Sequence, residues 1–135
     1  MLLLDTHSWL WLANDDRKLG KSARTAITSG AADDALYLSP ISLWEIALKS
    51  ARGKLQLDMP LKTWVRRALN LTRVHLAPIT PEIACDCAEL PSSFHGDPAD
   101  RLIAATARTE GMTLLTHDRA LLALAKQGYF KAIAT

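Results

Sequence analysis

Leu2-Leu3-Leu4-Asp5 is an apolar run that stops at a carboxylate. Three consecutive leucines before an acid predict a short buried strand, and the residues that follow, Trp9 among them, predict a helix. An acid between a buried strand and a helix has two ordinary uses. It caps the helix, or it faces a ligand beyond the carboxyl end of the strand.

Apolar runs and helical periodicity alternate along the rest of the chain. Further strands are predicted at 36–38, 74–76 and 113–116, with an edge strand at 132–133. Helices are predicted between them, over 21–31, 41–52, 60–69, 80–90, 98–110 and 119–126. Strands that alternate with helices predict an α/β fold: a single domain over 1–135, with a central, mostly parallel β-sheet flanked by α-helices.

The composition predicts one domain outside a membrane. With 135 residues, 49% hydrophobic and 22% charged, the chain is large enough for one continuous core and too short for a separate substrate domain. No apolar run approaches the roughly 20 residues that cross a bilayer, and the first residues lack the regions of a signal peptide. We therefore expect a cytoplasmic protein with no membrane partner.

Neither the cysteines nor the histidines are spaced as zinc ligands. Cys85 and Cys87 lie two apart, which suggests neither a disulfide framework nor a zinc knuckle. Only His117 lies beside a candidate site residue among the four histidines, His7, His75, His95 and His117.

Four carboxylates stand where predicted strands end or predicted helices begin: Asp5, Glu45, Asp100 and Asp118. In an open parallel sheet, ligands gather beyond the carboxyl ends of the strands, so acids at those ends converge however far apart they lie in sequence. Carboxylates at close range repel one another, and cations allow them to stay ionised. An all-oxygen set suits Mg²⁺ or Mn²⁺ better than zinc. The pattern therefore predicts a metal site.

Three of these acids also have a simpler explanation. Asp5 and Asp118 could each cap the helix that follows, although Thr6 could replace Asp5 in that role. Glu45 has Lys49 four residues on, the spacing of an exposed helical ion pair. The neighbours of Glu45 are apolar nearly all round, which predicts a partly buried acid that needs a partner.

The segment Asp97-Pro98-Ala99-Asp100 contains the fourth acid and a possible fifth. Asp97 has the position of a helix N-cap before a proline, and Asp100 takes the third helical position. Capping explains Asp97 well. It explains Asp100 less well, because a capping box prefers the longer Glu or Gln.

Four motifs, in the expected order, together resemble those of the PIN domain, and specifically of VapC-type toxins of toxin-antitoxin pairs. They are Leu3-Leu4-Asp5-Thr6-His7, Trp44-Glu45-Ile46-Ala47, Asp97-Pro98-Ala99-Asp100-Arg101-Leu102-Ile103-Ala104-Ala105-Thr106-Ala107 and Leu114-Leu115-Thr116-His117-Asp118. Four ordered motifs make the resemblance far more specific than a single match. It extends from Met1 to about Lys126, and the residues after 127 carry no motif.

The resemblance implies a PIN-like fold and a metal-dependent endoribonuclease that uses Mg²⁺ or Mn²⁺. It implies a site made of Asp5, Glu45, Asp100 and Asp118 as metal ligands, with Thr116 as a supporting hydroxyl. It also implies a homodimer and a cognate VapB-like antitoxin that blocks the site. Two-metal chemistry would leave a 5′-phosphate and a 3′-hydroxyl, without using the 2′-hydroxyl of RNA.

A basic stretch follows the second motif. Between positions 49 and 73, Asp58 is the only acid among the basic residues Lys49, Arg52, Lys54, Lys62, Arg66, Arg67 and Arg73. Such a flank suits a phosphodiester substrate, although basic residues on a helix are often only its solvated face. If the substrate is single-stranded RNA, the expected contacts are Lys54, Arg66, Arg67 and Arg73.

Two other classes of function compete with the nuclease. An Asp-based phosphatase needs a second Asp two residues after the first, where His7 stands, and a receiver domain needs its acceptor Asp near Gly53 and Lys54. A binding module for nucleic acid or protein, without turnover, has no need of intact acids in all four motifs. A metal titration separates that module from the nuclease.

The tryptophans predict an interface. All four lie in the N-terminal half, and a domain of this size can hardly bury every ring. Large aromatic residues at a surface favour interfaces. We therefore expect Trp11 and Trp64 to contact a second copy of the chain or the antitoxin, the alternative being that all four rings lie in the core.

Overall fold

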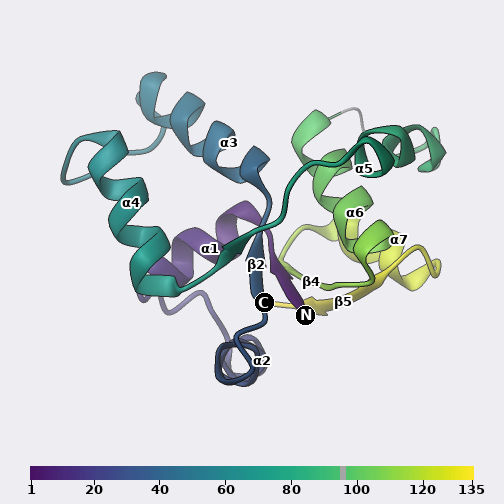
Figure 1. The fold of residues 1–135 in the computed structure, drawn as a ribbon, viewed down its shortest axis with the longest axis horizontal. Coiled ribbons are helices and arrows are strands. Elements are labelled where there is room, and N and C mark those ends of the chain that lie inside the picture. The colour runs from purple at the N-terminus through teal and green to yellow at the C-terminus, as the bar shows by residue number, and fades with distance from the viewer. Residues whose placement is uncertain (95–96) are drawn as a thin grey trace.

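Within residues 1–94 and 97–135, which the computed structural model describes, five strands form one sheet with the spatial order β3-β2-β1-β4-β5 (Figure 1). Every pairing between neighbouring strands is parallel. The strands are β1 (Leu2–Leu4), β2 (Leu36–Leu38), β3 (His75–Leu76), β4 (Thr113–Thr116) and β5 (Lys131–Ala134). The predicted α/β fold with a parallel sheet is therefore confirmed.

Helices pack on both faces of the sheet, and alternate leucines of β1 point into the two cores. Leu2 and Leu4 belong to one buried cluster and Leu3 to the other, as the two-residue period of a strand requires. Figure 1 shows α1, α3 and α4 on one side and α5, α6 and α7 on the other. The helices are α1 (Thr6–Ala13), α2 (Lys21–Ala32), α3 (Pro40–Ala51), α4 (Leu61–Thr72), α5 (Pro81–Asp86), α6 (Pro98–Glu110) and α7 (Arg119–Lys126).

No described helix could cross a bilayer, since even α6 has only 13 residues.

Side-chain caps set the starts of the helices that follow strands or turns. Each cap accepts a hydrogen bond from a backbone N–H of the first helical turn, which otherwise has no partner. These caps are Asp5, Ser39, Thr80, Asp97 and Asp118. The acids whose sequence positions predicted capping therefore do cap, and this role does not exclude a second one.

Two predicted elements differ from the structure. The helix expected over 80–90 ends at Asp86 and continues as a turn of 3-10 helix, η1 (Cys87–Glu89). The edge strand expected at 132–133 extends over all of β5, where residues 131–134 pair with β4. The segment after residue 127, which carries no motif, thus completes the sheet through backbone hydrogen bonds, which leave little trace in a side-chain pattern.

The order of the strands creates a switch point between β1 and β4. From β1 the chain adds β2 and β3 on one side of the sheet, and it later adds β4 and β5 on the other side. In open α/β sheets, a crevice that binds ligands lies beyond the carboxyl ends of the strands at such a point. Asp5 directly follows β1, and Asp118 comes two residues after β4.

The tryptophans divide between core and surface. Trp9 and Trp64 are buried and meet edge to face, with ring centroids 5.6 Å apart, and Trp9 Nε1 donates to Thr72 Oγ1 at 2.9 Å. The expectation that Trp64 lies at an interface is wrong for this reason. Trp11 is partly buried, and Trp44 is the exposed ring, with 48% of its surface accessible.

We expect Trp64→Ala to lower the free energy of unfolding by about 3–5 kcal/mol, because it opens a cavity against Trp9. The matched substitution Trp44→Ala should cost about 1 kcal/mol or less, since that ring is half exposed. Urea denaturation of both variants measures the difference. Equal losses of unfolding free energy in the two variants would contradict the conclusion that Trp64 is buried in the core and Trp44 is exposed.

Candidate active site

A cavity of 230 Å³ lies beyond the carboxyl ends of β1 and β4. It brings together all four predicted acids, although they are separated by up to 113 positions in the sequence. The residues that line it are Asp5, Thr6, His7, Glu45, Lys49, Asp97, Asp100, His117 and Asp118.

Adjacent strands and two packed helices deliver the four acids. Leu4 of β1 is in register with Leu115 of β4, so the ends of these strands lie side by side and bring Asp5 close to Asp118. Glu45 comes from α3 and Asp100 from the first turn of α6, and these two helices pack against each other.

Thr116 is buried next to the cavity and forms hydrogen bonds with both Asp5 and Asp118. Its buried hydroxyl donates to Asp5 Oδ2 and accepts from the backbone N–H of Asp118 at 3.0 Å. Asp5 Oδ1 also accepts from the N–H of Ser8 at 2.8 Å. Asp5 is 5% exposed, so these bonds hold an almost fully buried carboxylate in one orientation.

Glu45 is partly buried, as its apolar neighbours predict, and has a hydroxyl partner. Thr6 Oγ1 donates to Glu45 Oε1 at 2.5 Å and lies 2.9 Å from Ser42 Oγ. Burial raises the pKa of Glu45, while the bond from Thr6 and the charge of Lys49 lower it. Lys49 also lines the cavity, so one ammonium group faces the acids.

Asp100 has the most perturbed protonation of the four. Burial, followed by the charges of Asp97, Asp118, Glu45 and Asp5, raises the pKa of Asp100 from 3.8 to about 7. The repulsion expected among converging carboxylates is therefore present in this cavity, and it contributes to the raised pKa of Asp100.

Asp97 lies at the rim of the same cavity and starts α6. Its Oδ1 accepts from the N–H of Ala99 at 2.9 Å and from the N–H of Asp100 at 3.2 Å. These bonds confirm the predicted N-cap, and they orient the Asp97 carboxylate toward the backbone of its own helix.

Two histidines, His7 and His117, line the cavity with the acids, and Trp11 packs against both rings. The sequence alone had pointed only to His117, as the neighbour of Asp118. The rings of His7 and His117 meet edge to face at 4.8 Å, and Trp11 lies 4.9 Å from His117. His117 Nδ1 is 4.0 Å from Asp5 Oδ2. Burial and the nearby Lys49 lower the pKa of His7. The position of His7, two residues after Asp5 on the first turn of α1, was the available signal.

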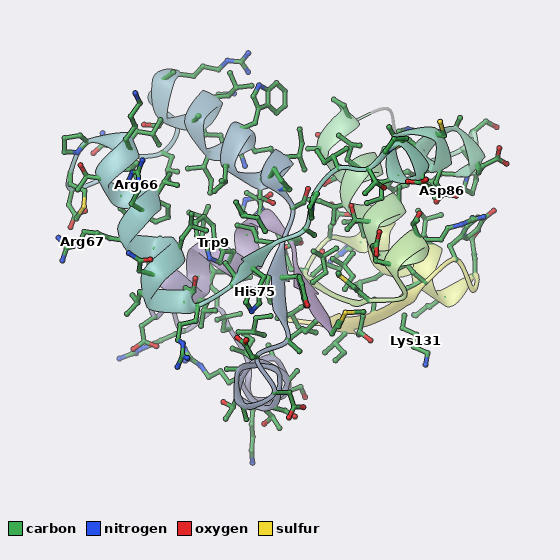
Figure 2. All side chains as sticks on the ribbon, in the orientation of Figure 1. Trp9, Arg66, Arg67, His75, Asp86 and Lys131 are labelled. Carbon is green, nitrogen blue, oxygen red and sulfur yellow. The ribbon has the colours of Figure 1, made fainter. Side chains whose placement is uncertain are left out.

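Other residues considered from the sequence lie elsewhere. His75 Nε2 pairs with Asp34 Oδ1 at 2.9 Å, and His95 lies outside the described residues. Figure 2 shows Arg66 and Arg67 on α4, at the edge of the view away from α6. None of the four expected RNA contacts, Lys54, Arg66, Arg67 and Arg73, lines the acidic cavity.

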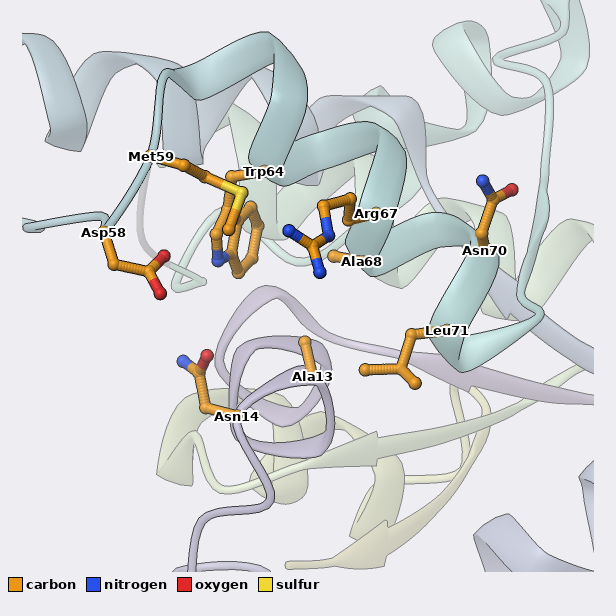
Figure 3. Close-up of a pocket in the computed structure, with 9 residues that line it drawn as sticks. All are labelled: Ala13, Asn14, Asp58, Met59, Trp64, Arg67, Ala68, Asn70 and Leu71. Atoms are coloured by element: carbon orange, nitrogen blue, oxygen red, sulfur yellow. The ribbon is translucent and has the colours of Figure 1, made fainter.

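A larger cavity of 460 Å³ lies between the end of α1 and α4 (Figure 3). Trp64 and Arg67 reach it from α4, and Asn14 borders it from below. Asp58 is the one carboxylate among its described lining residues. A single acid offers no convergent chemistry, so the smaller acidic cavity is the candidate active site.

The side chains that line the acidic cavity supply the donor atoms that a divalent cation prefers. The carboxylates of the cavity are all oxygen donors, and their mutual repulsion at Asp100 is what a cation would cancel. These side chains therefore fit Mg²⁺ or Mn²⁺ in chemistry. In residues 1–94 and 97–135, however, no three His, Cys, Asp or Glu side chains are already arranged to hold an ion.

A parallel α/β domain with carboxylates around one cavity at its switch point is the arrangement of a PIN domain. The chain belongs to the PIN domain family, because the sequence model of that family matches residues 2–127.

Known proteins are similar to this chain, in sequence or in fold, over most of its length. Ribonuclease VapC22 of Mycobacterium tuberculosis is 38% identical over 120 residues, which cover 89% of this chain and 88% of that protein. VapBC2 from Rickettsia felis, solved bound to a promoter DNA fragment, has a TM-score of 0.70 at 17% identity and covers 98% of this chain and 97% of that one. FitAcB from Neisseria gonorrhoeae has a TM-score of 0.67 at 24% identity, covering 98% and 96%. Both solved structures are similar to this chain in fold.

We expect Asp100→Asn to change how stability depends on pH. The pKa of Asp100 is about 7 in the folded protein and 3.8 ordinarily, so the folded state holds this proton more tightly. Ionisation of Asp100 therefore lowers the free energy of unfolding as pH rises from about 4 to about 7. The variant lacks this loss, and it should gain stability over the wild type at about pH 8 but not at about pH 4.

Urea denaturation in the presence of a chelator measures both proteins at each pH. A difference between variant and wild type that is the same at the two pH values would contradict the raised pKa of Asp100.

Proposed function

We propose that this chain is a metal-dependent endoribonuclease of the VapC type, which hydrolyses RNA phosphodiester bonds and is inhibited by a cognate VapB-like antitoxin. The observation that carries the proposal is the single cavity lined by Asp5, Glu45, Asp100 and Asp118, in a chain 38% identical to Ribonuclease VapC22. We take residues 1–135 as one nuclease domain, because β5 pairs with β4. We also propose that the protein acts in the cytoplasm.

The proposed cofactor is Mg²⁺ or Mn²⁺, with Asp5, Glu45, Asp100 and Asp118 as its ligands. When bound, the cation neutralises the scissile phosphate and lowers the pKa of the attacking water. Because the described side chains are not yet arranged as a ligand set, metal binding has to draw these carboxylates closer together.

The protein's own groups would orient this chemistry. Thr116 acts as a positioning residue, since its hydroxyl holds the Asp5 carboxylate and the backbone of Asp118 together. Thr6 in the same way donates to Glu45, which lines the same cavity. Lys49 offers a positive charge to a phosphate oxygen. The attacking group would be water, and the bond from phosphorus to the 3′ oxygen would break, with a proton taken up by that oxygen. The products would then carry a 5′-phosphate and a 3′-hydroxyl, and no side chain would become covalently bound.

The proposed partners are a VapB-like antitoxin and a second copy of the chain. Support comes from VapBC and FitAB complexes, whose toxin fold covers nearly all of this chain. An arginine of the antitoxin would be suited to block the cavity, because its guanidinium can pair with the carboxylates that hold metal. Sedimentation at micromolar concentration tests the homodimer.

We expect each of Asp5→Asn, Glu45→Gln, Asp100→Asn and Asp118→Asn to lower the cleavage rate of a mixed RNA pool at least about a hundredfold at saturating Mg²⁺, because each removes a metal ligand. The folded state should persist. Asp97→Asn is the matched control, and it should retain much of the activity while losing at most about 1 kcal/mol of capping. A variant of the first group with wild-type activity would remove its residue from the proposed site.

We also expect millimolar Mg²⁺ or Mn²⁺ to raise the melting temperature, because the ion binds the folded state and cancels repulsion within it. Asp5→Asn should reduce the shift. Thermal denaturation with and without metal measures the effect. A wild type that is indifferent to metal, and indistinguishable from Asp5→Asn, would favour a binding module without turnover.

A further inference from the structure

A groove of 240 Å³ adjoins the acidic cavity and is formed by α3 and the start of α6. It shares Glu45, Lys49 and Asp97 with the cavity, and it extends along α3 to Trp44 and Arg52. We call it the Trp44 groove. Because the two spaces share lining residues, a chain molecule whose phosphate lay in the cavity could extend into this groove.

Trp44 is a large aromatic side chain that does not contribute its ring to the buried core. It is 48% accessible, whereas Trp9 and Trp64 are buried. Among the described residues, every aromatic ring contact is made by rings other than Trp44. About half of a large flat side chain is thus accessible in the groove that adjoins the active-site cavity.

Two cations lie on the same side of α3 as Glu45. Residues at i, i+4 and i+7 share a helix face, so Glu45, Lys49 and Arg52 form one row. At 1.5 Å per residue, Lys49 and Arg52 lie about 6 Å and about 10 Å from Glu45 along the helix axis. Neither cation forms an ion pair within the described residues. The row therefore changes from acidic at the cavity to basic in the groove.

We propose that the Trp44 groove binds single-stranded RNA next to the scissile phosphate, with Trp44 stacked on one base and with Lys49 and Arg52 against the phosphates that follow. An aromatic platform beside a basic track is the combination that binds single strands, since every base offers a π-face and every nucleotide a charge. A duplex keeps its bases stacked inside and cannot offer one to Trp44. This inference rests on the proposed nuclease function and names its substrate class.

Charge favours RNA over a protein segment as the occupant. The antitoxin arginine proposed to block the cavity would, in this groove, meet the like charges of Lys49 and Arg52. Phosphates would be attracted to the same two groups. The inference replaces the RNA contacts expected from the sequence with Trp44, Lys49 and Arg52. The residues expected earlier line neither the groove nor the cavity: Lys54, Arg66, Arg67 and Arg73.

The test measures binding and cleavage separately. Binding of a short fluorescent oligouridine is followed by anisotropy in millimolar Mg²⁺, in an Asp100→Asn background that lacks one proposed ligand. Trp44→Ala should weaken binding at least about fivefold, the low end for loss of one base stack. Trp44→Phe should keep most of the affinity but lose the quenching of tryptophan fluorescence by RNA. Arg52→Gln should lower the slope of log affinity against log salt by about 0.7.

Two variants away from the groove serve as matched controls. Leu71→Ala removes another exposed apolar side chain, 70% accessible on α4, and Lys131→Gln removes a charge on β5 (Figure 2). Both should bind oligouridine as the background protein does. Wild-type affinity and quenching in Trp44→Ala would overturn the inference, as would equal binding of duplex RNA. Unchanged RNA affinity together with altered sedimentation of Trp44→Ala would also overturn it, in favour of a protein contact.

Cleavage by the protein with Asp100 intact distinguishes the two proposals. If that protein cleaves RNA while Trp44→Ala binds and cleaves normally, the groove inference fails and the nuclease proposal stands. If it cleaves nothing in Mg²⁺ or Mn²⁺ while Trp44-dependent binding persists, the nuclease proposal fails and the groove remains a single-strand site.

Discussion

The parallel pairing of β1 with both β2 and β4 is the constraint on which the rest of the structure depends. Three leucines supply its backbone hydrogen bonds on both edges, and their side chains enter both cores. Because β1 is central, its carboxyl end lies at the switch point, and Asp5 follows there directly. The position of Asp5 is thus a consequence of the most buried part of the sheet, which allows little movement.

Repulsion among the acids is balanced by hydrogen bonds from neutral donors. Asp5 accepts from Ser8 and Thr116, and Glu45 accepts from Thr6, so neutral groups of the protein hold both carboxylates in place. Burial, and after it the charges of the neighbouring acids, raise the pKa of Asp100 to about 7. Such a site lowers the stability of the fold so that it can bind a charge of opposite sign, a common cost of function.

Helix α3 connects the chemistry to the surface. Ser39 fixes its start just after β2, which places Glu45 six residues further on, at the cavity. The same helix then carries Lys49 and Arg52 outward, beside Trp44. One rigid element thus sets the distance between the acidic centre and the proposed track for a strand of RNA. Sites on helices are held more precisely than sites on loops.

The sequence by itself determined the elements and the identity of the candidate acids. Apolar runs, prolines and caps act within a few residues, so Leu2–Leu4, the Asp97 cap and the boundaries of most helices could be predicted. Only the tertiary structure decided that Trp64 is buried and Trp44 exposed, that His7 borders the acids, and that the edge strand expected at 132–133 extends over residues 131–134. These features depend on packing between segments far apart in the chain, which no local pattern encodes.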